Sequence, residues 1–111
     1  MGLAARLLQR RASPRKMIRL LPGPILDTNN TVVQCRPVDI SHEGLSILSE
    51  ALLSVGDHLI LKTHKDSIAL EVIWWKQDFG KQGLSRYGLK ATEASTDLEK
   101  IFQDAGCMKT T

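Results

Sequence analysis

Residues 68–75 read IALEVIWW, a stretch in which large apolar side chains occupy every second position. Successive side chains of a β-strand point to opposite faces of the sheet, so this alternation indicates a half-buried strand. Because Trp74 and Trp75 are neighbours, they must point to opposite faces, and we expect one to pack in the core and the other to lie outside it. The residues predicted to share one face are Ile68, Leu70, Val72 and Trp74.

Five further segments have the composition of strands and are separated by short polar turns. The first strand starts at Lys16, bends at Pro22-Gly23-Pro24 and continues to Leu26, where residues 27–30 suit a hairpin turn. The remaining predicted strands cover residues 31–38, 45–48, 58–62 and 84–91.

The end of the chain has the signals of one amphipathic helix. Thr96 and Glu99 form a capping box, in which each side chain can bond a backbone N–H group near the start of the helix. Gly106 is a typical residue just after the C-terminal end of a helix. The residues at the spacing of one helical face are Leu98, Ile101, Phe102 and Ala105. Six strands followed by this helix predict a mainly β fold, a six-stranded antiparallel β-barrel with a C-terminal α-helix over one opening.

Charge is distributed unevenly along the chain. Residues 1–19 contain six basic residues and no acid, whereas the remainder has nine basic residues against twelve acids. The basic segment therefore predicts an anionic partner, with phosphate as the leading candidate. A length of 111 residues fits one domain. We expect a basic N-terminal arm over 1–15, the barrel and helix over 16–106, and a short tail over 107–111.

Several classes of function are disfavoured by the sequence. The two cysteines have no metal-ligand spacing and the three histidines are scattered, so no metal site is expected. Ser41 has His42 beside it, but no further base or orienting group completes a catalytic set, so we do not expect an enzyme. No apolar stretch is long enough for a membrane span, and cysteine usage fits a reduced cytoplasm. The expectation is a soluble cytoplasmic protein.

Two short motifs stand far apart in the sequence. Residues 11–15 read RASPR, with arginines four positions apart, and 24 positions after Arg15 residues 39–44 read DISHEG. Asp39 and Ser41 lie two positions apart, hence on the same side of an extended backbone, and Gly44 permits a positive φ or close approach to the main chain. Alone, the second motif is also an ordinary polar turn between two strands.

Together, R-x-x-x-R and D-x-S-x-x-G in a small six-stranded chain that ends in a helix resemble the PilZ domain, from Arg10 to about Ala105. In that family both motifs bind cyclic di-GMP. The resemblance implies that Arg11 and Arg15 contact phosphate and guanine and that Asp39 accepts from guanine N–H groups. Guanidinium suits both tasks, because its donors fit phosphate oxygens and the guanine edge in pairs.

The resemblance extends to further residues. It implies that the Ser41 hydroxyl lies near the ligand, that Gly44 keeps the turn open, and that Gly88 is the late-strand glycine that could let a base approach. The sequence departs from the family where Lys90-Ala91 lacks the aromatic residue often found there. Arg10 could stack on a base and favour two ligand molecules, which is a separate hypothesis.

Alternatives remain open at this point. Arg6 and Arg10, and likewise Arg15 and Arg19, also stand four apart, although only the Arg11 to Arg15 pair encloses a proline directly before the first strand. The main hypothesis is a bacterial cyclic di-GMP receptor, without cofactor, that acts on a downstream protein to control motility, attachment or exopolysaccharide output. A nucleotide-independent protein-interaction module is the second hypothesis. The third hypothesis is a β-barrel that binds RNA or DNA. It is disfavoured because the chain has only five aromatic residues on which bases could stack. We therefore expect no RNA or DNA partner, and we expect a monomer or a homodimer.

Overall fold

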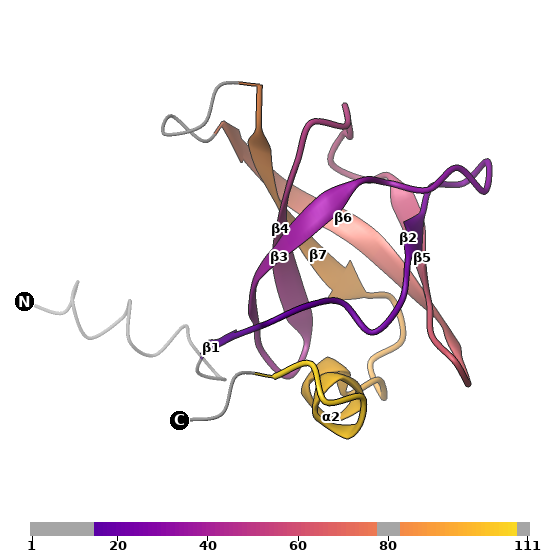
Figure 1. The fold of residues 1–111 in the computed structure, drawn as a ribbon. Coiled ribbons are helices and arrows are strands. Elements are labelled where there is room, and N and C mark those ends of the chain that lie inside the picture. The colour runs from indigo at the N-terminus through magenta and orange to yellow at the C-terminus, as the bar shows by residue number, and fades with distance from the viewer. Residues whose placement is uncertain (1–14, 78–82, 109–111) are drawn as a thin grey trace, which may run out of the picture.

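The computed structural model describes residues 15–77 and 83–108. These residues form one antiparallel sheet of seven strands and one helix at the C-terminal end (Figure 1). The mainly β prediction with a C-terminal helix is therefore confirmed. The elements are β1 Lys16–Met17, β2 Ile25–Leu26, β3 Cys35–Ile40, β4 Gly44–Ser49, β5 His58–Lys62, β6 Ser67–Gln77, β7 Ser85–Ala91 and α2 Leu98–Asp104.

The sheet has the strand order β1-β3-β4-β7-β6-β5-β2 and curls into a half-barrel, with α2 under one end (Figure 1). The prediction of six strands is wrong, because the expected first strand is split. After β1, Arg19 donates its backbone N–H to the carbonyl of Cys107 at 2.8 Å, so the chain leaves the sheet there. It then crosses to β5, where Gly23 passes so close that a Cβ would lie 1.7 Å from the carbonyl oxygen of Lys62. The two short pieces thus form opposite edges.

The concave face of the sheet and one side of α2 enclose a single apolar core. Leu98 and Phe102 of the helix are fully buried against it, and each such side chain contributes roughly 1.5–3 kcal/mol by leaving water. The sheet contributes fully or almost fully buried side chains from six strands, β2 to β7. They are Ile25, Ile40, Leu45, Ile47, Leu59, Leu61, Leu70, Val72, Tyr87 and Leu89.

The start of α2 differs from the prediction. Asp97 caps the helix, since its carboxylate accepts the backbone N–H of Lys100 at 3.1 Å, whereas the N–H of Thr96 donates to the carbonyl of Glu93 in the preceding turn. Glu99 does not complete a capping box and forms an ion pair with Lys16 Nζ at 2.7 Å. Glu99 therefore connects α2 to β1, whereas the sequence predicted that it would cap the start of the helix.

The strand leading into the 39–44 motif is also displaced from its predicted position. It begins at Cys35 and continues to Ile40, so Asp39 belongs to β3 and only residues 41–43 form the turn before β4. The earlier segment is irregular because Val33 donates its N–H to the carbonyl of Ile25 beside the β2 edge. Within the described ranges, no helix combines the length and the apolar character needed to cross a membrane.

Candidate ligand-binding site

Two β-bulges shape the convex face of the sheet. The register shifts between Pro37 and Asp39 in β3, and again between Val72 and Trp74 in β6. A bulge places two residues opposite one and so re-aims the side chain that follows. Both shifts occur at the same level of the sheet, where they bring Asp39 and Trp74 to the convex face.

The bulge in β6 overturns the prediction that Trp74 shares a face with Val72. Trp74 lies opposite Gly88, outside the core, and is half-buried. Trp75 returns to the concave face opposite Tyr87, but near the end of the strand, where it remains 54% exposed. Neither tryptophan belongs to the buried core, so the expectation that one of them packs there is also wrong.

Four residues on successive strands form a line across the convex face, which we call the Asp39 row. Asp39 on β3 lies opposite Ser46 on β4, Ser46 lies opposite Gly88 on β7, and Gly88 lies opposite Trp74 on β6. Met17 of β1 extends the row on the other side of Asp39. Side chains that are cross-strand neighbours are close enough to interact directly.

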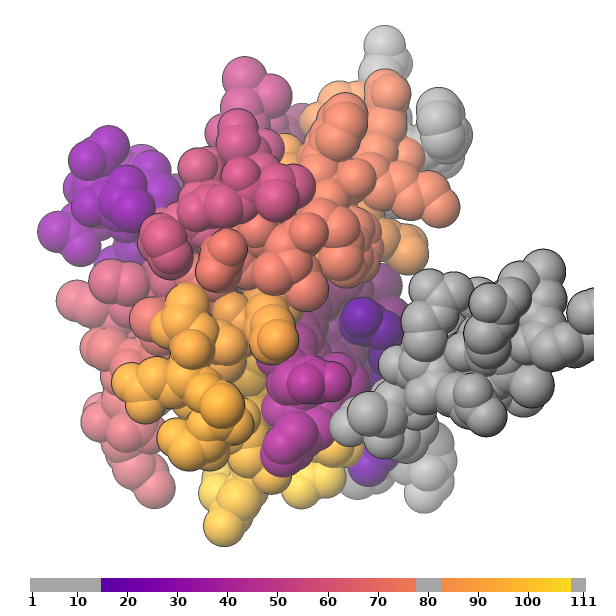
Figure 2. Space-filling model, turned by 180° about the vertical axis from the view of Figure 1, so that it is seen from behind, coloured from indigo at the N-terminus to yellow at the C-terminus, as the bar shows by residue number. Residues whose placement is uncertain are grey.

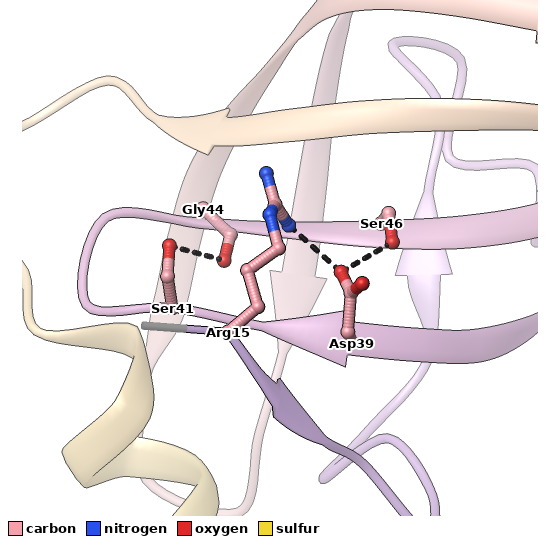
Figure 3. A network of polar contacts seen from close by, with 5 residues as sticks. All are labelled: Arg15, Asp39, Ser41, Gly44 and Ser46. Atoms are coloured by element: carbon pink, nitrogen blue, oxygen red, sulfur yellow. Dashed lines mark hydrogen bonds and ion pairs between the residues drawn. The ribbon is translucent and has the colours of Figure 1, made fainter. Parts of the chain in front are cut away.

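Asp39 is the centre of a polar network at the β1 end of this row (Figure 3). Arg15 donates from Nη1 to Asp39 Oδ1 at 2.7 Å, and the hydroxyl of Ser46 donates to the same oxygen, also at 2.7 Å. Ser46 is 2% exposed, whereas the Arg15 and Asp39 side chains are 37% and 25% exposed. The buried hydroxyl therefore positions a carboxylate that solvent can reach.

The ion pair itself is readily exchanged. Partly exposed pairs of this kind contribute at most about 1 kcal/mol, because water screens them. A carboxylate has about four lone-pair positions, and the described residues use two of those on Asp39. Asp39 can thus accept further N–H groups from a ligand while Arg15 turns toward an anion.

Gly88 and Trp74 form the other half of the row. A Cβ at Gly88 would lie 2.1 Å from Trp74 Nε1, which no real structure tolerates, so the indole ring lies directly on the backbone of β7. Residue 88 must therefore be glycine in this structure, because the indole ring of Trp74 occupies the space that a side chain would need. An aromatic ring fixed in this way presents a flat apolar surface next to the polar network.

The turn after β3 is closed by its own main chain. The N–H of Ser41 donates to the carbonyl of Gly44 at 2.8 Å, and the Ser41 hydroxyl lies 3.4 Å from the same oxygen (Figure 3). A Cβ at Gly44 would lie 2.8 Å from the carbonyl oxygen of Leu89, so glycine is required there by the approach of β7. The carbonyl of His42 accepts the N–H of Leu98, which attaches the turn to α2.

A shallow hollow of about 200 Å³ lies on the convex face beside the row. Larger hollows of about 380 to 650 Å³ occur elsewhere in the described part of the chain, but they contain none of the predicted site residues. Asp39 does not line the small hollow itself, but it is hydrogen-bonded to Arg15, which does. The residues of interest that line it are Arg15, Ser41, Gly44, Trp74 and Gly88.

The structure thus brings five of the seven predicted residues to one region of the convex face, namely Arg15, Asp39, Ser41, Gly44 and Gly88. Arg10 and Arg11 lie outside the described residues. Sequence reasoning missed Ser46 and Trp74. The only sequence signal for Ser46 is a small polar residue within the apolar run of residues 45–48, and Trp74 was assigned to the wrong face because the bulge could not be foreseen.

A family model described as PilZ domain matches residues 9–105, which is nearly the whole chain. The chain therefore belongs to the PilZ domain family. Neither the curated proteins nor the solved structures gave a match to it.

Proposed function

We propose that this protein is a receptor for cyclic di-GMP and that the ligand binds across the Asp39 row and the hollow beside it. Membership of the PilZ domain family supports the proposal. The observation that carries it is the 2.7 Å contact between Arg15 and Asp39, residues 24 positions apart that come from the two motifs. Two motifs that form one ligand site must meet in space, and these two residues do.

Each group in this region has a chemical task in the proposal. The Arg15 guanidinium leaves Asp39 to bind a phosphate or the O6 and N7 edge of guanine, to which its paired donors are matched. Asp39, kept in place by Ser46, accepts the N–H donors of guanine. Trp74 offers a flat surface for a base, and Arg10 and Arg11 supply further positive charge.

The output of the receptor is a change at the base of the arm, residues 1–15. Lys16 is paired with Glu99 of α2, so a movement of the adjacent Arg15 toward a ligand is transmitted to the helix and to the surface around it. A partner protein that binds only one arrangement would read this change, because a ligand shifts populations toward the state it prefers. Control of motility, attachment or exopolysaccharide output in the cytoplasm, without catalysis, is the role we propose.

Calorimetric titration with cyclic di-GMP tests the proposal. Wild-type protein should release saturable heat, and Arg15→Ala should weaken binding by about 5- to 150-fold, since a paired guanidinium contact contributes about 1–3 kcal/mol. Raising the salt concentration should weaken wild-type binding because the contacts are ionic.

Arg19→Ala is the matched control. Arg19 is exposed, lies four positions from Arg15 and donates its backbone N–H to the carbonyl of Cys107, and it is not among the residues that line the hollow. It should bind like the wild type. Equal loss in both variants would support the Arg15 to Arg19 register instead. Absence of heat with wild-type protein would contradict the proposal and favour a nucleotide-independent interaction module.

A further inference from the structure

Among the residues that the structure describes, the C-terminal half of β6 has a strand on one side only and so forms a sheet edge. Pairing with β5 ends at Glu71, and the next residue, Val72, exchanges backbone hydrogen bonds with Gly56 and Asp57 of the β4–β5 loop. From residue 73 to residue 77, the pairing given by the described residues is with β7 alone. A strand with a free edge presents backbone donors and acceptors that another strand can pair with.

Apolar side chains are exposed along this edge. Ile73 is 44% exposed and Trp75 is 54% exposed, while Val55, one residue before the segment that covers Val72, is 61% exposed. Figure 2 shows the end of β6, in salmon, at the surface beside the β4–β5 loop. Tryptophan is one of the residues that contribute most binding energy at the centres of protein interfaces, so Trp75 is a candidate contact residue.

The convex face next to the edge is basic. Arg36 on β3, Leu48 on β4, Arg86 on β7 and Lys76 on β6 are successive cross-strand neighbours, which we call the Arg86 row. Lys76 lies directly opposite Arg86, an arrangement that destabilises a sheet because like charges repel. The ion pairs among the described residues include none of the three cations. Positive charge therefore collects beside the open edge.

The two faces of the sheet at this edge differ in character, because one is aromatic and the other is positively charged. Trp75 points to the concave face with Tyr87, whereas Lys76 points to the convex face with Arg86. A strand added to the edge alternates in the same way, so one set of its side chains meets Trp75 and the other meets Lys76. We propose that residues 73–77 bind an extended segment of a partner protein whose sequence alternates apolar and acidic residues, by addition of a strand to β6.

Charge decides against a second copy of this chain as the occupant. An antiparallel pair of two β6 edges centred on Trp75 would bring both copies of Lys76 and both of Arg86 to the same face within about two residues of the symmetry axis. Four like charges would then lie close together, which opposes association. An acidic segment instead neutralises the two cations beside the edge.

The proposal can be tested without nucleotide, with a hexapeptide of alternating glutamate and valine blocked at both ends. Addition to the full-length protein should shift the backbone amide resonances of residues 73–77 and slow their hydrogen exchange. A peptide of the same composition with three glutamates followed by three valines should bind at least about fivefold more weakly, because its side chains do not match the two faces. A lysine–valine peptide should not bind.

Charge reversal identifies the contact. Lys76→Glu should weaken the glutamate–valine peptide about tenfold, by removing one surface attraction and adding a repulsion, and should allow the lysine–valine peptide to bind. Lys65→Glu, in the exposed turn at the other end of β6, should change either affinity less than twofold. The proposal is overturned if the peptides bind equally, if no peptide binds at millimolar concentration, or if sedimentation finds a dimer that Trp75→Glu dissociates.

Discussion

Two neighbouring lines of residues on the convex face, the Asp39 row and the Arg86 row, differ in how their charges are met. In the Asp39 row the carboxylate is matched by Arg15 and by a buried hydroxyl from Ser46. In the Arg86 row two cations face each other across β6 and β7. The strands and the face are the same, so the difference lies in the side chains and in the bulges that aim them.

One face of the sheet carries two surfaces of different character. Both bulges fall at the Asp39 row, where they turn Asp39 and Trp74 outward and create a preformed polar and aromatic surface. The side chains of the Arg86 row follow the regular alternation of a strand, and no acidic side chain among the described residues forms an ion pair with its cations. Internal pairing characterises the first row and unmatched charge the second.

Gly88→Ala should have the largest effect on the Asp39 row. The new Cβ would lie 2.1 Å from Trp74 Nε1, so the indole must leave its place, and we expect the free energy of unfolding to fall by about 1–3 kcal/mol. Chemical denaturation measures this loss. Trp74→Ala should make the same glycine substitution nearly neutral, which a double-mutant cycle would reveal.

Gly44→Ala is the contrasting variant for that cycle. Its Cβ would meet the backbone carbonyl of Leu89 at 2.8 Å, so truncation of Trp74 should not restore stability. Rescue of both glycine variants by Trp74→Ala would contradict the close packing assigned to Gly88.

Ser46→Ala should have an intermediate effect. It removes a buried donor to a charged acceptor, and hydrogen bonds of this kind contribute about 1.5–3 kcal/mol, less here because Asp39 remains partly accessible to water. We expect a loss near 1 kcal/mol in denaturation and weaker cyclic di-GMP binding in calorimetry. Arg15→Ala should leave stability nearly unchanged, so unequal stabilities with similar binding defects would separate the two roles.

Lys76→Glu should have the smallest effect on the folded protein, and in the opposite direction. Placing an acid opposite Arg86 replaces repulsion by attraction, so stability should rise by about 0.2–1 kcal/mol at low salt and return toward the wild type at high salt. A variant less stable than the wild type at every salt concentration would show that the cations of the Arg86 row are not in conflict.

The sequence predicted much of the fold because alternation and turn residues are local signals. The strand predicted over residues 58–62 is present with the same bounds, and Gly106 ends the last turn with a φ of 73°. The failures share a cause, which is tertiary contact. Gly23 against Lys62 splits the first strand, and Lys16 draws Glu99 away from the capping role.

The candidate site also contains residues that the sequence predicted and residues that it did not. The motif residues could be named because they resemble the two motifs of the PilZ family, and the contact between Arg15 and Asp39 agrees with that resemblance. Ser46 and Trp74 could not be named, since a bulge leaves no signature in a single sequence and changes which face a side chain reaches. Their place in the Asp39 row follows from strand register, which is a property of the folded sheet.

The fluorescence of Trp74 can report directly whether cyclic di-GMP binds over the Asp39 row, as we propose. In the variant Trp75→Phe, Trp74 is the only tryptophan and lines the hollow beside Arg15. Cyclic di-GMP should change its emission saturably, and Arg15→Ala in the same background should shift the midpoint at least about fivefold. Calorimetric binding with no change in Trp74 emission, or an unshifted midpoint, would contradict binding over the Asp39 row.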